Sequence, residues 1–357
     1  MERTGRIFHF LANKKLDCVI IKDQYAIRYL TGFTGDSSLL YADNDRAVLI
    51  TDGRYVYQAR QQVRYCQVLE YKSEHADSIW EAAAEQIAGN RTVGFDADTF
   101  LYRDMMSLQQ YLRPGLNLVP VSLKALRMVK DDQELKSLWQ ATKIADEAYS
   151  RMLVELKPGM TEKMLAAHLE YYMRSLGSEE VSFPTIVASG YRSAMPHGLP
   201  TDKEVQVGDF VTFDFGAVYN GYHSDCTRTV VLGMANSWHK EIYTIVEEAQ
   251  YRGLKSAKPG ITGAELDAIV RDYITSRGYG KNYLHGLGHG VGLEIHELPH
   301  INKRGDIPLK SGMTFTIEPG IYIPDKGGVR IEDTVVLTND GARVLSGLKK
   351  QLLEIVD

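Results

Sequence analysis

Gly208–Gly216 reads GDFVTFDFG, and Gly312–Gly320 reads GMTFTIEPG. Both stretches have glycine at the first and ninth positions, threonine at the fifth and an acid at the seventh, and they start 104 residues apart. The two acids, Asp214 and Glu318, stand inside apolar runs that are typical of strands. A buried carboxylate is costly unless it is paired or bound to metal. One such acid could reach solvent at a strand end, but two matched acids indicate related halves that share one site.

The repeat extends beyond these two stretches. Lys157–Thr161 reads KPGMT and Lys258–Thr262 reads KPGIT, an offset of 101 residues. Each threonine is a predicted N-cap, followed by a predicted helix over Glu162–Leu176 or Gly263–Arg277. TVVL also recurs, at 229–232 and 334–337. A unit of about a hundred residues that occurs twice indicates an old duplication and excludes a short-period solenoid.

The composition is that of an ordinary globular chain. Its 357 residues predict two domains, and a net charge of −5 argues against a phosphate-binding surface. The three cysteines are scattered without metal-ligand spacing, which fits a reducing compartment. No apolar run approaches the length of a membrane span, and the N-terminus has no signal-peptide core. We therefore expect a cytoplasmic protein that binds neither nucleic acid nor membrane.

The chain is predicted to divide near a charged stretch, Lys124–Glu134, into residues 1–124 and residues 125–357. The first part alternates strand and helix patterns, which favours a smaller α/β domain. Its predicted strands are Cys18–Lys22, Ala47–Thr51, Gln67–Tyr71 and Thr92–Asp96, and its predicted helices are Arg54–Val63 and Ala76–Ala88. The second part holds both copies of the repeat. Its long helices and antiparallel strands favour an α+β domain with an internal pseudo-twofold repeat.

A second pair of acids joins Asp214 and Glu318. Asp225 follows Asp214 by eleven residues, and the Asn220-Gly221 turn between them predicts a hairpin that brings both onto neighbouring strands. Asp225 stands four residues before one TVVL and Glu332 two before the other, so both share the strand face of the repeated threonine. Four close carboxylates cannot all stay ionised, whereas two divalent cations would balance their charge. The competing interpretation is that the acids pair with Arg228, Arg330 and Lys326.

Four of the ten histidines fall between residues 285 and 300, in HGLGHGVGLEIHELPH. They are His285, His289, His296 and His300, and such a cluster predicts a neutral imidazole in the site. His296–His300 also matches H-E-x-x-H, the one-zinc signature that requires both histidines on one helical face. Pro299 and the alternating glycines upstream disfavour that helix, so we do not expect a site of this kind.

These motifs together resemble the aminopeptidase P and prolidase group of dinuclear metallopeptidases, over nearly the whole chain. RYLTGFTG (28–35) and LITDGRY (49–55) are similar to that family's creatinase-type N-terminal domain. The Asp214 and Asp225 pair, HGLGH, EPGIY and GGVRIED are similar to its catalytic domain. The resemblance implies a creatinase-like α/β domain over residues 1–124 and a pita-bread catalytic domain over residues 125–357.

The resemblance also implies a role for each site residue. The implied metal ligands are Asp214, Asp225, His289, Glu318 and Glu332, which would hold two divalent ions, manganese first, with cobalt or zinc as alternatives. The implied catalytic residues are His197, His296 and Glu318. The implied substrate-binding or supporting residues are His285, Tyr322 and Arg330.

The implied reaction is metal-dependent hydrolysis of the bond between an N-terminal residue and proline. SFPTIVASGYRSAMPHG (182–198) resembles the short bacterial aminopeptidase P form, so we expect an Xaa-Pro aminopeptidase that cleaves small peptides with proline at the second position. An Xaa-Pro dipeptidase (prolidase) is the alternative, although no cation stands out in a motif as a clamp for a dipeptide's carboxylate. Arg192 is, however, close in sequence to His197. A non-catalytic pita-bread binding protein is disfavoured because all five ligands are present. We also expect a homodimer.

Overall fold

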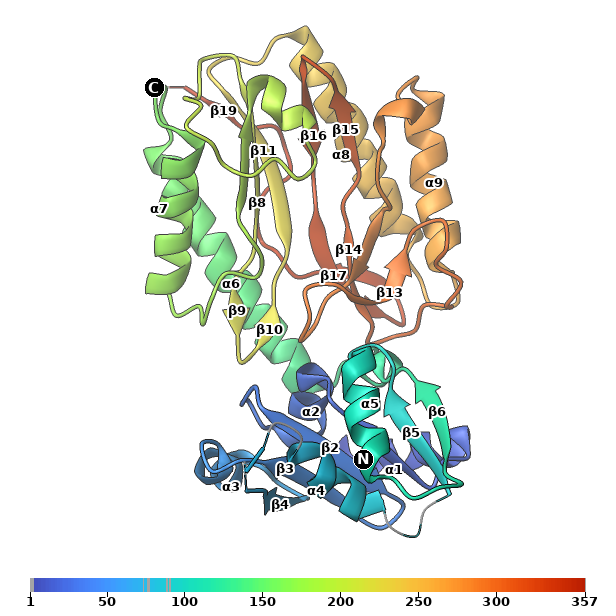
Figure 1. Ribbon diagram of the computed structural model, residues 1–357. Coiled ribbons are helices and arrows are strands. Elements are labelled where there is room, and N and C mark those ends of the chain that lie inside the picture. The colour runs from blue at the N-terminus through green and yellow to red at the C-terminus, as the bar shows by residue number, and fades with distance from the viewer. Residues whose placement is uncertain (1–2, 73, 76–77, 88, 90, 357) are drawn as a thin grey trace. The chain divides into compact units, whose positions relative to one another are not determined.

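The computed structural model describes residues 3–72, 74–75, 78–87, 89 and 91–356 of the chain. The chain divides into two units, Met1–Arg127 and Met128–Asp357, whereas the sequence pattern put the division after residue 124 (Figure 1). Among the described residues, no helix combines the length and apolar character that a membrane crossing requires.

The first unit is a six-stranded mixed sheet with the strand order β4-β3-β2-β1-β5-β6. β2 is antiparallel to β1 and β3, and the other neighbours pair in parallel. Its strands are β1 (Cys18–Ile21), β2 (Ser38–Asp43), β3 (Ala47–Thr51), β4 (Gln67–Glu70), β5 (Thr92–Asp96) and β6 (Asn117–Val121). Its helices are α1 (Arg3–Lys14), α2 (Gln24–Thr31), α3 (Val56–Gln62), α4 (Ser78–Ile87), α5 (Tyr102–Tyr111) and the 3₁₀ turn η1 (Lys124–Arg127).

The predicted strands of this unit match β1, β3, β4 and β5 to within one residue. The predicted helices contain α3 and α4, and positions 76, 77 and 88 of the second lie outside the described residues. Six of the described elements were not predicted: α1, α2, α5, β2, β6 and η1. The two family-like motifs form turns. Gly32 ends α2 in the left-handed conformation (φ 83°), and Asp52 accepts a hydrogen bond from the N–H of Arg54 at 2.9 Å just before α3.

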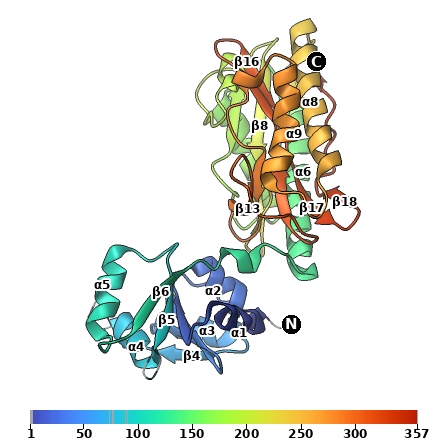
Figure 2. The same ribbon diagram turned by 90° about the vertical axis from the view of Figure 1, so that its right-hand side faces the viewer.

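The second unit consists of two halves, each with a pair of packed helices and a sheet. The first half has α6 (Asp132–Glu155), α7 (Glu162–Ser175) and a sheet of order β19-β11-β8-β7. The second half has α8 (Ser237–Ser256), α9 (Gly263–Ser276) and a sheet of order β13-β12-β14-β17-β18. Figure 2 shows α8 and α9 side by side along the strands of this unit.

The first sheet comprises β7 (Ile186–Ser189), β8 (Phe210–Phe215), β11 (Cys226–Leu232) and β19 (Glu354–Ile355). The second comprises β12 (Gly288–Gly290), β13 (Glu297–Ile301), β14 (Thr314–Ile317), β17 (Asp333–Thr338) and β18 (Gly341–Val344). Two short hairpins pair β9 (Val218–Tyr219) with β10 (Tyr222–His223) and β15 (Gly320–Ile323) with β16 (Gly327–Arg330). The remaining turns are η2 (Gly190–Ala194) and η3 (Gly280–Asn282).

Strand register and helix caps confirm the repeat. Thr212 pairs with Thr229 across β8 and β11, and Thr316 pairs with Thr334 across β14 and β17. The side chains of Thr161 and Thr262 accept backbone hydrogen bonds at the starts of α7 and α9, which end one residue before the predicted positions. Each half also has its own apolar core, in which its helix pair packs on its central strands. The α+β prediction for this part of the chain is confirmed.

Candidate active site

The first half of the repeat supplies two acids from adjacent strands. Asp214 lies on β8, and the β9–β10 hairpin turns at Asn220 (φ 50°) and Gly221 (φ 75°), as the sequence predicted. The chain then returns so that Asp225 stands just before β11. In the β8–β11 register, Thr227 is opposite Asp214 and Cys226 opposite Phe215. The two aspartates therefore come from the same end of one antiparallel pair.

The second half supplies the matching pair. Glu318 follows the last residue of β14 and Glu332 precedes the first residue of β17, and Ile317 pairs with Asp333 between them. The two halves are joined at this point, because the N–H of Glu332 donates to the carbonyl of Thr227 at 3.1 Å. The hydroxyl of Thr334 likewise donates to the carbonyl of Asp225 at 2.9 Å.

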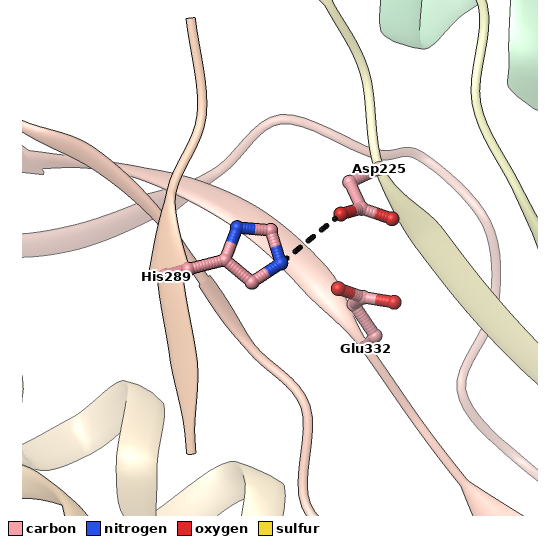
Figure 3. Close-up of side chains that lie close together, drawn as sticks. All are labelled: Asp225, His289 and Glu332. Carbon is pink, nitrogen blue, oxygen red and sulfur yellow. Dashed lines mark ion pairs between the residues drawn. The ribbon is translucent and has the colours of Figure 1, made fainter. Parts of the chain in front are cut away.

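His289, in the middle of β12, points its ring at these acids. Its Nε2 lies 3.5 Å from Asp225 Oδ2 and 3.4 Å from Glu318 Oε1. One donor atom each from His289, Asp225 and Glu332 fall within 4.8 Å of one another (Figure 3). Nδ1 of His289 lies 3.1 Å from the carbonyl of Gly290 and must donate a proton to it. That bond leaves the Nε2 lone pair directed at the acids, the tautomer that a metal ligand requires.

Burial changes the proton affinity of this cluster. Burial, together with the Glu332, Asp214 and Glu318 carboxylates, raises the pKa of Asp225 well above its usual value. Burial likewise raises the pKa of Glu332 well above its usual value and the pKa of Glu318 to about 7. Burial lowers the pKa of His289 to about 3, so its imidazole is neutral. The carboxylates can therefore be ionised together only if a positive charge lies beside them. The neutral imidazole of His289 does not provide that charge.

The competing interpretation, in which basic side chains neutralise the acids, holds for Asp214 alone. Arg330 Nη2 donates to Asp214 Oδ2 at 2.6 Å, whereas Arg228 pairs with Asp333 at 2.7 Å. Within the described residues, no lysine or arginine forms an ion pair with the carboxylate of Asp225, Glu318 or Glu332. In addition, Asp214 Oδ1 is buried without a hydrogen-bond partner in this part of the chain. This donor set of carboxylates and one neutral imidazole fits divalent cations.

All five predicted metal ligands line a cavity of about 510 Å³ in the second unit. The predicted residues His197, His285, His296 and Arg330 line it as well, together with His300, Asn302 and an apolar wall of Phe183, Pro184, Ile186, Leu199 and Ile295. The rings of His296 and His289 are 4.3 Å apart between centroids. His197 is exposed, unlike the buried acids Asp214, Asp225 and Glu332. Glu297–Ile301 is a strand, which confirms that H-E-x-x-H is not a helical zinc motif here.

Tyr322 is the predicted substrate residue that does not line the cavity; it is buried beside the two that do. Its hydroxyl accepts a hydrogen bond from Arg330 Nη1 at 2.8 Å and lies 2.8 Å from His285 Nε2. Nδ1 of His285 lies 2.7 Å from the carbonyl of Gly286, so Nδ1 donates and Nε2 accepts the proton of Tyr322. Tyr322 therefore orients two groups of the cavity wall and does not itself present a contact surface.

Two threonines orient the acids and were not singled out as site residues. Thr227 Oγ1 donates to Glu332 Oε2 at 2.6 Å, and Thr316 Oγ1 donates to Glu318 Oε1 at 3.0 Å. Thr316 Oγ1 also accepts the N–H of His289 at 3.1 Å. Thr316 lies two positions before Glu318, and that period-two spacing was an available signal. Thr227 lies 105 positions from Glu332, so no local spacing relates these two residues.

Three basic residues near the cavity could in principle bind a substrate carboxylate, and they differ in whether they are already paired. Arg192 pairs with the buried carboxylate of Glu162 at 3.0 Å and donates to the carbonyl of Leu199 at 2.7 Å. A smaller cavity of about 370 Å³ shares His285, Gly286 and Asn302 with the larger one and is lined by Lys303 and Arg304. Both of these side chains are exposed, and neither forms an ion pair with a described residue.

Comparisons with known proteins agree with this architecture. Residues 136–339 match metallopeptidase family M24, and residues 3–129 match the creatinase/prolidase N-terminal domain. The Xaa-Pro dipeptidase of Pyrococcus furiosus is 40% identical over 99% of both chains. The solved structure of an Xaa-Pro dipeptidase from Bacillus anthracis is 41% identical, with a TM-score of 0.94 over 99% of both chains. That of an X-Pro aminopeptidase from Thermotoga maritima is 37% identical, with a TM-score of 0.90 over 99% of this chain and 100% of that one.

Proposed function

The chain belongs to metallopeptidase family M24, and from that premise we propose that it is an Xaa-Pro dipeptidase that uses two divalent cations. The observation that carries the proposal is the set of four carboxylates, three of them buried, and one neutral imidazole that lines a single cavity. Two relatives named Xaa-Pro dipeptidases, at 40% and 41% identity over 99% of the chain, support the substrate class. The sequence alone favoured the aminopeptidase; the comparisons favour its alternative.

In this proposal Asp214, Asp225, His289, Glu318 and Glu332 hold the two cations, with manganese ahead of cobalt and zinc. Bound divalent cations would supply a nucleophilic water at neutral pH and polarise the carbonyl of the scissile bond. Two donor atoms support this assignment. Asp214 Oδ1 is buried and has no hydrogen-bond partner among the described residues, and His289 Nε2 has a lone pair because Nδ1 carries the proton.

The protein's own groups handle the protons. Glu318 accepts a proton from the attacking water and delivers it to the prolyl nitrogen as the C–N bond breaks, which releases the first residue and proline. His296, a neutral imidazole because burial lowers its pKa, donates its ring N–H to the carbonyl oxygen as negative charge develops there. His197, which is exposed and lines the cavity, contacts the same end of the substrate. The scissile amide has no N–H, so no acceptor is needed opposite its nitrogen.

The preference for dipeptides over longer peptides depends on which protein group binds the carboxylate of the proline residue. A dipeptidase needs a cation for that group. Arg192 is engaged with Glu162, but Lys303 and Arg304 are exposed at a cavity that adjoins the larger one. We assign the recognition of the dipeptide carboxylate to this pair. The apolar wall formed by Phe183, Ile186 and Ile295 accommodates the rest of a small peptide.

The test compares kcat/KM for three substrates: an X-Pro dipeptide, its C-terminal amide and an X-Pro-Y tripeptide. We expect the dipeptide to be preferred by at least about 10-fold, the effect of losing one charge-assisted contact of about 1.4 kcal/mol or more. Arg304→Ala with Lys303→Ala should reduce that preference, whereas Lys326→Ala, which removes an exposed lysine away from the cavity, should not. Equal or better cleavage of the tripeptide would identify an Xaa-Pro aminopeptidase instead.

A further inference from the structure

A buried ion pair lies beside the cavity and takes no part in the chemistry above. Lys130 Nζ is 2.5 Å from Glu297 Oε1, and each side chain is only 1% exposed. Apolar residues of similar volume often stabilise a protein as well as a buried ion pair does. Such a pair is therefore weak evidence for stability, and its location is the more informative property.

Lys130 is fixed to the segment that leads into the second-half acids. Its N–H donates to the carbonyl of Gly312 at 2.9 Å, and its neighbour Val129 forms an antiparallel bridge with Met313. β14 begins at the next residue and leads to Glu318. The ammonium group also donates to the carbonyl of Met128 at 3.4 Å.

Glu297 is fixed to the segment that carries the histidines. It follows His296 directly, begins β13, and pairs with Gly290, the residue after His289. Its carboxylate packs against Gly292: a Cβ built there would lie 2.3 Å from Glu297 Oε1. The carboxylate therefore touches the loop of residues 291–296, which joins His289 to His296.

The two histidines differ in how they are held. His289 pairs with His300 on β13, its N–H bonds Thr316 Oγ1 on β14, and its strand is hydrogen-bonded on both sides. His296 ends the 291–296 loop, which contains no strand residues. Backbone hydrogen bonds hold the start of this loop, from Val291 to Thr314 and from His223 to Gly292, and Glu297 is the first strand residue at its other end, next to His296.

We propose that Lys130 and Glu297 are positioning residues for His296. Their ion pair anchors the start of β13 to the Lys130 segment and so fixes where the imidazole of His296 stands relative to His289. The proposal rests on the proposed peptidase function for its effect on turnover, but the position of the His296 ring can be measured without any reaction.

The kinetic test uses Glu297→Gln and Lys130→Met. Both should bind metal within about 3-fold of wild type, because the strand of His289 is hydrogen-bonded on both sides and Thr316 also holds its N–H. Both should lose about 10- to 100-fold in kcat with little change in KM, since a displacement of about 1 Å has an effect of this order. The matched control is Asp23→Asn in the first unit, which breaks the buried pair of Asp23 with Arg127 (3.0 Å). It should lower Tm similarly and leave kcat unchanged.

The second test records histidine ring resonances of ¹⁵N-labelled, metal-free protein. Glu297→Gln should shift the His296 resonances, assigned with His296→Ala, and Asp23→Asn should not. Lys130→Arg keeps the charge in a larger group and covers the case in which the other variants fail to fold; it should show a smaller shift and about 3- to 10-fold lower kcat. Unchanged His296 resonances with a kcat within 2-fold of wild type in a folded variant would overturn the proposal. A wild-type protein inactive on all Xaa-Pro peptides would contradict the proposed function. The resonance test would still decide whether the ion pair positions His296, because it measures the ring without any reaction.

Discussion

Thr316→Val tests whether the Thr316 hydroxyl holds two of the proposed metal ligands, Glu318 and His289, in place. The substitution keeps the shape of the side chain and removes two hydrogen bonds, to Glu318 Oε1 at 3.0 Å and from the N–H of His289 at 3.1 Å. A hydrogen bond to a charged group contributes about 1.5–3 kcal/mol, and each 1.4 kcal/mol is a factor of about ten. We therefore expect the metal Kd to rise about 10- to 100-fold, the range found when groups that orient metal ligands are removed.

The repeat provides a matched control for this experiment. Thr212 occupies the same position in the first half, but its hydroxyl lies 3.0 Å from that of Thr229 and forms no hydrogen bond with an acid among the described residues. Thr212→Val should cost about 1 kcal/mol of stability and leave the metal Kd unchanged. The assay is equilibrium competition with a chromogenic chelator, using manganese and the folded metal-free proteins. Equal metal affinity in Thr316→Val and wild type, or an equal loss in Thr212→Val, would show that the Thr316 hydroxyl does not hold Glu318 and His289 in place.

Three further predictions follow from the same geometry. His296→Ala should retain metal but lose about 10²–10³ in kcat, while Glu318→Gln should lose both metal and activity. Elemental analysis and kinetics of both variants test this; metal retained in Glu318→Gln, or lost in His296→Ala, would mean that the two roles are reversed. Asp333→Leu leaves the buried guanidinium of Arg228 without its carboxylate partner, so the free energy of unfolding should fall by about 3–5 kcal/mol in urea denaturation. A loss below about 1 kcal/mol would contradict this prediction. Gly288→Ala would place a Cβ 2.1 Å from the carbonyl oxygen of Thr316, so we expect its metal binding to be lost, and wild-type affinity in a titration would contradict that expectation.

The sequence was sufficient where the relevant spacing is local. The acids Asp214 and Asp225 are joined by one hairpin, and the second pair repeats that arrangement about a hundred residues later, so pattern and turn chemistry located all four. The same holds for the rejection of a helical zinc motif, because Pro299 already excludes the required helix.

The remaining features depend on contacts between distant residues. Arg228 and Asp333 are 105 positions apart, and Lys130 and Glu297 are 167 apart, so no spacing rule could pair them. Arg192 is near His197 in sequence, and only the folded chain shows that it pairs with Glu162. Tyr322 was predicted to bind substrate or to support the site, and its burial beside Arg330 and His285 is a tertiary property that the motif does not contain.

The most direct test of the account is a metal titration of the metal-free protein that follows the release of proline from an X-Pro dipeptide. The account predicts no hydrolysis without a divalent cation and a rise with added manganese that levels off near two equivalents per chain. Full activity in protein shown by elemental analysis to contain no divalent metal would contradict it.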